Sequence, residues 1–249
     1  MKMSGLWKAP LLALAVVALS LITASCNTNT TGNGEVGVRV IDAVPDGPAI
    51  DIYFNGSKIF TNVVFAVPQP NTSPASYLTG PAGSVSIQGF QTGTTINPVA
   101  PIGIIPLQDG VQYTVVAVGL EANESAPLVV ADDSTAPVGT SVEVRAINAS
   151  NSSPTGGLDV YIVPPATQDL SNFTPQVTGL NNNQATGYQK LSFLSGGYSV
   201  IFTANGSKAP IITQPITANA SSITTLVIFD NPGGNNGMST TPLVLNDLN

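Results

Sequence analysis

Two arginines, each followed along the chain by an aspartate and a tyrosine, are the residues whose types and order suggest a shared site. The two sets are Arg39 with Asp51 and Tyr53, and Arg145 with Asp159 and Tyr161, and the chain has no other arginine. A guanidinium, a carboxylate and an aromatic ring side by side form a candidate ligand platform for a sugar or a peptide. The structural alternative is a cross-strand ion pair with the ring packed on the arginine stem, and an exposed pair of this kind contributes only about 0–1 kcal/mol. Glycosidase chemistry at Asp51 is disfavoured, because it needs a second carboxylate and none is suggested nearby.

Apolar alternation places each set on two strands. Arg39 lies between Val38 and Val40, and Asp51 and Tyr53 alternate with isoleucine and phenylalanine residues. Because successive side chains of a strand point to opposite faces, the arginine, aspartate and tyrosine all point away from the apolar face. If the two strands are neighbours in one sheet, the three side chains share its outer face.

The strands around the second set repeat those around the first in the same order. Five segments match: VGVRVIDAV with VEVRAINAS, IDIYFN with LDVYIV, PAGSVSIQ with SGGYSVIF, QYTVVAVG with ITTLVIFD, and PLVVAD with PLVLND. Ordered self-similarity of this kind indicates a tandem duplication. It predicts two domains, 36–132 and 141–249, joined by a linker at 133–140.

Each predicted domain has the composition of an all-β fold. The apolar residues are rich in Val and Ile, which favour strands, and 24 Gly and 20 Pro supply frequent turns. Asn55-Gly56, directly after the strand that carries Tyr53, predicts a type I′ hairpin turn. Roughly seven short strands in roughly a hundred residues predict two tandem antiparallel β-sandwiches of immunoglobulin-like or transthyretin-like topology.

The charge balance excludes one class of partner. Only 8% of the residues are charged, against roughly 25% in ordinary soluble proteins. Removal of Lys2 and Lys8 with the leader leaves five basic residues against fourteen acidic ones, a net charge of −9. A chain this acidic is unsuited to neutralising phosphates, so nucleic acid is excluded as a partner. No basic patch exists to attract anionic lipid.

Residues 1–25 are typical of a cleaved export signal. Lys2 and Lys8 precede the apolar run PLLALAVVALSLITA, which is too short for a spanning helix and is followed at once by polar residues. The only cysteine of the chain, Cys26, comes directly after this segment. The plain alternative is a secretory signal with a stray cysteine.

The residues ITASC resemble the lipobox of bacterial lipoproteins, with Thr23 where that pattern usually has leucine. The resemblance implies cleavage before Cys26 and acylation of this cysteine, and two or more acyl chains give lasting attachment to a membrane. Asn27 stands where the inner-membrane retention signal has aspartate, which favours the outer membrane if the cell has two. Residues 26–35 would then be a flexible tether.

Catalytic and metal chemistry find little support in the sequence. The chain has no histidine, which removes histidine-based acid–base catalysis, nucleophilic triads and ordinary zinc sites. Aspartates could offer oxygens to calcium, namely Asp42, Asp46 and Asp51, or Asp132 with Asp133. They match no spaced calcium loop, and turn capping explains them more simply. We therefore expect no catalytic residue, metal or cofactor.

The run VRVIDAVPDGPAIDIYFNG, followed by PAGSVSI and QYTVVAVG, resembles a family of bacterial envelope domains known as domain of unknown function 4397. The likeness covers most of 36–132 and, more weakly, 142–247, where PDGPAI becomes SSPTGGL. The resemblance implies tandem domains behind an export signal and supplies no reaction.

Together these features predict a non-catalytic cell-envelope lipoprotein that is a surface-exposed structural, adhesive or ligand-binding module. Its expected partners are the membrane, through the lipid anchor, and a polysaccharide or an envelope protein. The alternative is a carbohydrate-binding or accessory subunit of an envelope polysaccharide-processing system. A stand-alone hydrolase is disfavoured by the missing histidines.

Overall fold

The structure is a computed structural model that describes residues 34–71, 77–96, 98–121, 123–217, 219–233 and 237–248. All regular elements in these ranges are strands, which confirms the all-β class. No helix in the described part of the chain is long and apolar enough to cross a membrane. The predicted leader 1–25, the predicted lipidation site Cys26 and nearly all of the predicted tether 26–35 lie outside the described residues.

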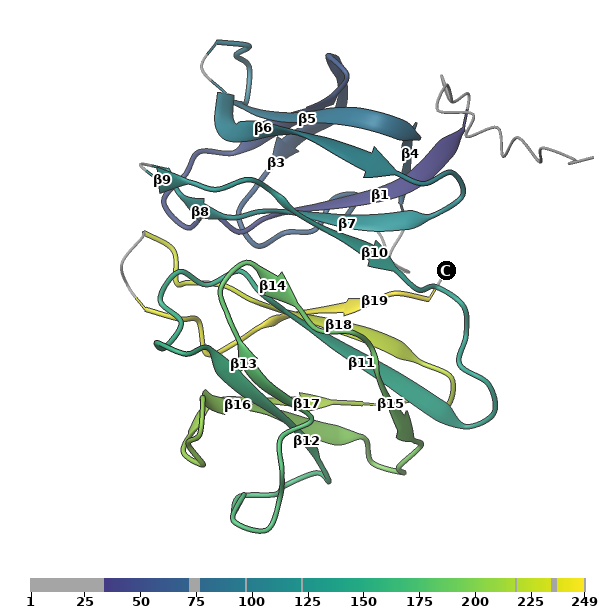
Figure 1. Ribbon diagram of the computed structural model, residues 1–249, viewed down its shortest axis with the longest axis vertical. Coiled ribbons are helices and arrows are strands. Elements are labelled where there is room, and N and C mark those ends of the chain that lie inside the picture. Colours follow the sequence, from purple (N-terminus) through teal and green to yellow (C-terminus); the bar gives the residue numbers. More distant parts are fainter. Residues whose placement is uncertain are drawn as a thin grey trace, which may run out of the picture. The chain divides into compact units, whose positions relative to one another are not determined.

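The first sandwich consists of two four-stranded sheets (Figure 1). Its inner sheet, which carries Arg39, has the order β10-β7-β1-β4, and its outer sheet has the order β3-β2-β5-β6. A two-stranded sheet pairs β8 with β9. The strands are β1 (Glu35–Asp42), β2 (Ile50–Phe54), β3 (Ser57–Val63), β4 (Leu78–Pro81), β5 (Gly83–Gln91), β6 (Pro98–Leu107), β7 (Gln112–Ala117), β8 (Gly119–Leu120), β9 (Asn123–Glu124) and β10 (Leu128–Asp132).

The second sandwich has the same plan. Its inner sheet, which carries Arg145, has the order β14-β11-β18-β19, with β15 also paired to β11, and its outer sheet has the order β13-β12-β16-β17. The strands are β11 (Ser141–Asn148), β12 (Leu158–Val163), β13 (Val177–Leu180), β14 (Gln184–Ala185), β15 (Gln189–Ser192), β16 (Tyr198–Ala204), β17 (Pro210–Ile216), β18 (Ile223–Ile228) and β19 (Leu243–Asn246). Both sandwiches belong to one compact unit.

Each inner sheet contains a parallel pair that the expectation of antiparallel sandwiches did not include. β1 runs parallel to β7, and β11 runs parallel to β18, whereas the other strand pairs are antiparallel. The chain leaves the inner sheet after β1 and builds the outer sheet before β7 returns, so a hairpin cannot join these two strands. The short strand β4, in a stretch rich in Pro and polar residues, was also not predicted.

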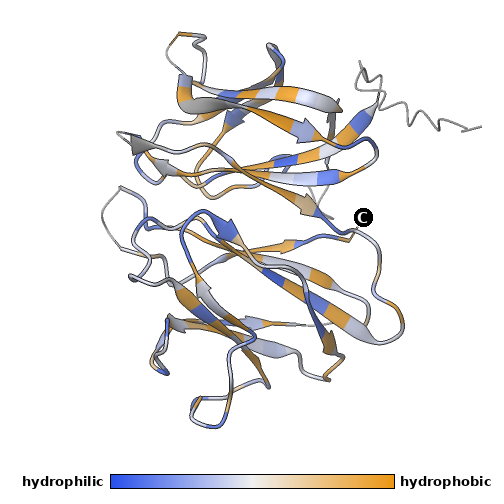
Figure 2. Cartoon of the chain, in the orientation of Figure 1, coloured by the Kyte–Doolittle hydropathy of each residue, from blue (hydrophilic) through white to orange (hydrophobic). Residues whose placement is uncertain are grey.

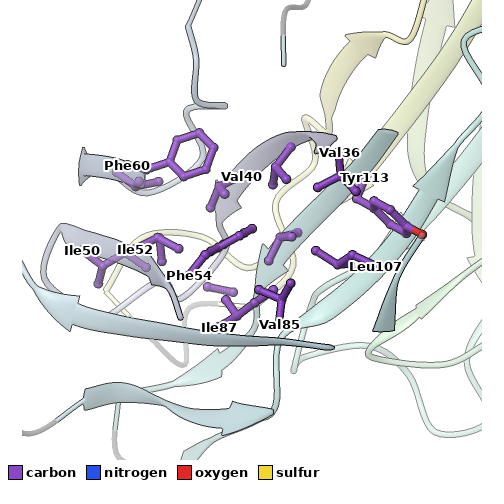
Figure 3. Packing of buried hydrophobic residues seen from close by; sticks show 14 residues of the cluster. Val36, Val40, Ile50, Ile52, Phe54, Phe60, Val85, Ile87, Leu107 and Tyr113 are labelled. Atoms are coloured by element: carbon purple, nitrogen blue, oxygen red, sulfur yellow. The ribbon is translucent and has the colours of Figure 1, made fainter. Parts of the chain in front are cut away.

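Each sandwich has its own apolar core between its two sheets. In the first, Phe54 and Ile52 of β2 converge with Val40 of β1 and Ile87 of β5 (Figure 3). A matching cluster in the second joins residues of β11, β12, β16 and β18. The alternation that builds these cores is visible along β11 in Figure 2, where polar and apolar residues succeed one another.

The predicted hairpin turn is confirmed between β2 and β3. Asn55 and Gly56 have φ of 49° and 79°, the left-handed backbone that a type I′ turn requires at both central residues. Gly56 adopts it without steric cost, and asparagine tolerates it better than most residues. The turn therefore fixes the register of the strand that carries Asp51 and Tyr53.

A third apolar cluster draws residues from both inner sheets. The four buried members from the first sandwich have buried equivalents in the second, because the register of the parallel pairs aligns Arg39 with Arg145 and Thr114 with Thr225. The buried members are Ile41, Ala43, Val116 and Val118 of the first sandwich and Ile147, Ala149, Val227, Phe229 and Leu245 of the second. Phe65 packs edge-on against Phe229 with ring centroids 5.5 Å apart. The two sandwiches therefore meet through the same patch on each, as the subunits of a symmetric dimer do.

Candidate functional site

Arg39 lies in the interface between the sandwiches and is only 1% exposed. Its Nη2 donates hydrogen bonds to Thr114 Oγ1 at 2.7 Å and to Asp247 Oδ1 at 2.7 Å, and it lies 3.4 Å from Asp132 Oδ2. Asp247 follows the last strand of the second sandwich, so the shorter ion pair of Arg39 crosses to the other copy. The guanidinium also lies 5.1 Å from the ring centroid of Tyr77.

Arg145 repeats this arrangement from the other side and is also 1% exposed. Its Nε donates to Thr225 Oγ1 at 2.9 Å, and its Nη2 donates to Asp132 Oδ1 at 2.5 Å, again crossing between the copies. The carboxylate of Asp247 lies 3.5 Å away, and the ring centroid of Tyr188 lies 4.6 Å from the guanidinium.

Each aspartate is held by a threonine and a tyrosine of its own sandwich. Tyr77 donates to Asp132 Oδ2 at 2.9 Å, and Thr114 donates to the same oxygen at 2.6 Å. Asp247 accepts the equivalent hydrogen bonds from Tyr188 and Thr225. We call these eight residues the arginine network: Arg39, Tyr77, Thr114 and Asp132 from the first sandwich, and Arg145, Tyr188, Thr225 and Asp247 from the second.

The electrostatics of the arginine network favour the charged form of Arg39 and the protonated forms of its two tyrosines. Burial alone would lower the pKa of Arg39, but the charges of Asp247 and Asp132 outweigh burial and hold that pKa above its ordinary value. The pKa of Tyr77 is raised by burial and by the charge of Asp132, and that of Tyr188 by burial and the charge of Asp247. Both hydroxyls therefore stay protonated and remain donors. Two arginines and two aspartates sum to zero charge, which limits the cost of burying them.

The geometry of the arginine network is better suited to positioning the two sandwiches than to acting on a solute. The side chains of the four charged residues are at most 1% exposed, so solutes do not reach them. An ion pair buried between two surfaces fixes one way of packing them, since any other arrangement leaves a buried charge without its partner. The arginine network therefore sets the orientation of one sandwich on the other.

The expectation that each arginine shares an outer face with its aspartate and tyrosine was wrong. Arg39 is on β1 of the inner sheet, and Asp51 and Tyr53 are on β2 of the outer sheet, so the two strands are not neighbours. The alternation was right about direction, because Arg39 does point away from the core of its own sandwich. That side faces the other sandwich instead of solvent, and the aspartates that pair with Arg39 are Asp132 and Asp247.

Asp51 and Tyr53 do share the face of β2 that points away from the core, as predicted. Asp51 is fully buried there and accepts hydrogen bonds from Lys58 Nζ at 2.7 Å, Asn62 N at 2.9 Å and Gly93 N at 3.3 Å. Burial alone would raise the pKa of Asp51, but these hydrogen bonds hold it below its ordinary value. The aspartate thus ties strand β3 and the turn at Gly93 to β2.

Asp159 and Tyr161 stand in the same relation on β12. Asp159 accepts hydrogen bonds from Gly179 N of β13 at 3.0 Å and from Gly206 N, in the turn after β16, at 2.8 Å. It therefore ties a neighbouring strand and a turn to β12. Tyr161 is 2% exposed, and Lys208 Nζ lies 4.8 Å from its ring centroid. The six residues predicted from the sequence are therefore divided between one interface and two separate outer sheets.

The outer face of the first sandwich carries the more accessible tyrosine. We define the Tyr53 face by the residues of β2, β3, β5 and β6 that point away from the core: Tyr53, Lys58, Ser86, Gln88, Phe90 and Ile104. The rings of Tyr53 and Phe90 pack edge to face with centroids 5.2 Å apart, and Lys58 Nζ lies 5.5 Å from the Tyr53 centroid. This face combines aromatic, aliphatic and polar groups and is the candidate binding surface.

Sequence reasoning did not assign six members of the arginine network to a site: Tyr77, Thr114, Asp132, Tyr188, Thr225 and Asp247. The repeat did contain a signal for four of them, because the matched segments QYTVVAVG and ITTLVIFD align the threonines, and PLVVAD and PLVLND align the aspartates. Two arginines and two aligned aspartates in a chain with so few charges suggest mutual pairing.

The aspartates considered for calcium have other partners. Asp132 binds both arginines, and Asp46 accepts a hydrogen bond from Glu121 N at 2.9 Å. Asp42 accepts one from Val44 N at 3.0 Å, and Asp133 accepts one from Thr135 N. In the described part of the chain, no group of three or more aspartate, glutamate, cysteine or histidine side chains is placed to hold a metal ion.

The fold and the arginine network define a tandem β-sandwich protein whose two copies are joined through a symmetric buried interface. The chain matches the family described as "Domain of unknown function (DUF4397)" over residues 36–161, half of its length, and it belongs to that family. The match covers the first sandwich and continues through β11 into β12.

Other comparisons give little detail. No curated protein matches the chain. Among solved structures, the Bacillus anthracis TIE protein is 13% identical to it, with 79% of this chain and 33% of that chain aligned and a TM-score of 0.22. The chain thus aligns with about a third of the length of that protein.

Proposed function

We propose that the chain is a non-catalytic module of the cell envelope in which two sandwiches act as one rigid body, tethered to a membrane by lipid on Cys26. The rigid body would hold a binding surface at a set orientation and distance from the membrane. Partners of a module with this acidic character are envelope proteins or polysaccharides. Nucleic acid does not fit, because the net charge is −7.

The observation that supports this proposal is the buried ion pairing of the repeated arginines and aspartates. Each of Arg39, Arg145, Asp132 and Asp247 has an ion-pair partner across the interface, and their side chains are at most 1% exposed. A duplicated protein that uses its strongest polar groups to fix the orientation of its copies is better suited to a structural and binding role than to catalysis.

The lipid tether is tested by metabolic labelling. Cells that express the full chain are grown with radiolabelled palmitate, and we expect label on the wild type and none on the Cys26→Ser variant. The variant should also leave the membrane fraction, because the anchor contributes the membrane affinity. Label that persists in Cys26→Ser contradicts the tether.

The alternative function is that of a carbohydrate-binding or accessory subunit of an envelope polysaccharide-processing system. It is favoured by the Tyr53 face, where an aromatic ring lies beside the amine of Lys58 and the amide of Gln88. Sugars bind such surfaces through their apolar ring faces and hydroxyl groups. A pull-down with immobilised glycans and peptidoglycan, with Tyr53→Ala as the comparison, tests it. Equal recovery of the variant and the wild type contradicts glycan binding at this face.

A further inference from the structure

The first sandwich has a shallow apolar pocket at the end where β1 and β7 stop and their loops begin. We call it the Ala117 pocket. Ala117 is the last residue of β7, and Glu121, which follows β8, is exposed and is the one charged residue of the lining. The remaining lining is apolar and includes Val44, Pro48, Ile50 and Val99. An apolar surface with a single acid beside it is suited to a ligand that is partly aliphatic and partly charged.

The second sandwich differs at the same end. Ile228 stands in the position of Ala117, because the parallel pairs align the two residues, and it is fully buried. The acid at this end, Asp230, is also buried, and its carboxylate accepts hydrogen bonds from Asn151 N at 2.9 Å and from Ser152 N at 3.2 Å. The second sandwich therefore has a larger side chain at the position of Ala117 and binds its acid within its own loop.

The acidic side of the Ala117 pocket has two carboxylates. Glu121 N donates a hydrogen bond to Asp46 Oδ1 at 2.9 Å, so the two residues lie side by side, and both are exposed. Neither carboxylate takes part in an ion pair among the residues that the structure describes. Together they favour a positively charged group at this edge of the pocket.

The basic residues of the chain lie elsewhere. Beyond residue 33 there are five of them, and Arg39 and Arg145 belong to the buried arginine network. Lys58 pairs with Asp51, Lys208 donates to a backbone carbonyl, and Lys190 lies opposite Glu143 in the register of β11 and β15. A cation that neutralises Asp46 and Glu121 therefore has to come from a partner.

The Ala117 pocket also lies away from the predicted point of attachment. The predicted tether leads into Glu35 at the start of β1, and the loop that lines the pocket follows Asp42 at the end of this strand. A strand rises by about 3.3 Å per residue, so the two ends of β1 are roughly 23 Å apart. A tethered module would thus present the pocket at the end of the strand that is remote from its tether.

We infer that the Ala117 pocket binds a lysine side chain of a partner protein. The aliphatic stem lies on the apolar lining, and the ammonium group meets the carboxylates of Glu121 and Asp46. Lysine fits a shallow pocket of this kind because its methylene groups cover apolar surface while the charged end stays in water. The inference rests on the proposed binding role and specifies the chemistry of the protein partner.

The test uses Nα-acetyl-lysine N-methylamide as the probe and the ¹⁵N-labelled full chain as the receptor. We expect saturable shifts of the Gly47, Ala117 and Glu121 amide signals, with a dissociation constant on the order of millimolar, as suits a single side chain. The same compound acetylated on Nε keeps the aliphatic stem and loses the charge. It should bind about two- to fivefold more weakly, because an exposed ion pair contributes little more than that.

Two variants address the two parts of the pocket. Ala117→Val fills space that the lysine stem would occupy and should weaken binding about tenfold. A rise in its Tm, measured on the same sample, shows that the variant is folded. Glu121→Gln removes one charge from an exposed side chain and should weaken binding about two- to fivefold. Asp133→Asn, in the linker, makes the same change of charge away from the pocket and should bind as the wild type does.

The outcomes separate this inference from the proposed function. Absence of saturable shifts, shifts centred on other residues, or equal affinity for the probe and its Nε-acetyl form overturns the lysine site. Binding that Ala117→Val and Glu121→Gln both retain in full overturns it as well. None of these results affects palmitate labelling of Cys26, so the lipid tether stands or fails by its own test.

Discussion

In both sandwiches an arginine and a threonine lie side by side on the parallel pair of the inner sheet, a tyrosine precedes a neighbouring strand, and an aspartate stands at the end of an edge strand. The outer sheets share less. Residues 164–176, the covering segment, join β12 to β13 and pack over the outer face around Tyr161. Only a two-residue turn joins the equivalent strands beside the Tyr53 face. The two copies are thus alike where they touch and different where they do not.

The physical reason lies in what each position must satisfy. Arg39 needs Asp247 from the other copy, and Arg145 needs Asp132, so a change in one copy leaves a buried charge unpaired in the other. An outer face has only its own sandwich to satisfy, and a longer loop or a new side chain there costs little. The comparison teaches that the interface is more constrained than the outer faces are.

Breaking one charge of the arginine network is expected to have the largest effect. Asp247→Ala removes the acceptor for Arg39 and Tyr188 and leaves Arg39 buried beside Asp132 alone at 3.4 Å. We expect a loss of about 3–5 kcal/mol in the free energy of unfolding, measured by urea denaturation. Asp133→Ala, next to the network but exposed, should change little. A loss below about 1 kcal/mol for Asp247→Ala would show that the sandwiches do not depend on each other.

A second difference between the copies, at Asp42, predicts that the free energy of unfolding depends on pH. Asp42 is 1% exposed and accepts one hydrogen bond from Val44 N, and its Oδ2 has no hydrogen-bond partner among the residues that the structure describes. Its equivalent is Asn148, whose Nδ2 donates to Leu180 O at 3.0 Å. Burial raises the pKa of the Asp42 carboxyl from 3.8 to about 7.

Between those two values the unfolded chain has released the Asp42 proton and the folded chain still holds it. The contribution of Asp42 therefore lowers the free energy of unfolding as pH rises from about 4 to about 7, by up to about 4 kcal/mol, and is constant above that. Asp42→Asn, which copies the second sandwich, removes this term. Urea midpoints at pH 5 and pH 8 check it: the variant should gain clearly more on the wild type at pH 8 than at pH 5. An equal offset at both values contradicts the buried, protonated carboxyl.

The features that depend on local sequence patterns could be predicted from the sequence. Alternation located the strands around Arg39 and Tyr53, and Asn55-Gly56 fixed a hairpin with the expected left-handed backbone. The aligned segments revealed the duplication. Each of these signals involves residues close together in the chain, where propensity and period decide the outcome.

The partners of Arg39 and the order of the strands depend on contacts between segments that are distant in the sequence. Alternation shows which side of a strand Arg39 faces, but not whether water or a second sandwich covers that side. Thr114 and Asp247 lie 75 and 208 residues from Arg39, and no local rule pairs them. The parallel pairing of β1 with β7 was missed for the same reason, because the chain passes through another sheet between them.

A smaller effect is expected at an apolar pocket beside the first core. Ala117 lines a shallow apolar pocket with Val44, Pro48 and Ile50, and its equivalent is Ile228, which is fully buried. Ala117→Val should extend the side chain into this space and raise the free energy of unfolding by about 1 kcal/mol, seen as a higher Tm. The reverse change, Ile228→Val, should cost a similar amount. A lower Tm for Ala117→Val would mean that the first core is already full.

The smallest effect is expected for the two lysines that cover the tyrosines. Lys58 is exposed and donates to Asp51, which keeps its two backbone N–H donors when the lysine is removed. Lys58→Ala should therefore leave the unfolding midpoint almost unchanged and raise the pKa of Asp51 toward its ordinary value, which a carboxyl NMR titration measures.

Lys208→Ala is the matched change in the second sandwich, and we expect it to have a larger effect on the local stability of residues 164–176. Lys208 donates to the Phe173 carbonyl and lies over the buried ring of Tyr161. Its loss therefore removes a surface charge and also loosens the covering segment. Hydrogen exchange at the Phe173 and Gln176 amides should then accelerate in Lys208→Ala and remain unchanged in Lys58→Ala. If both variants leave these amides equally protected, the covering segment is held by its apolar contacts alone.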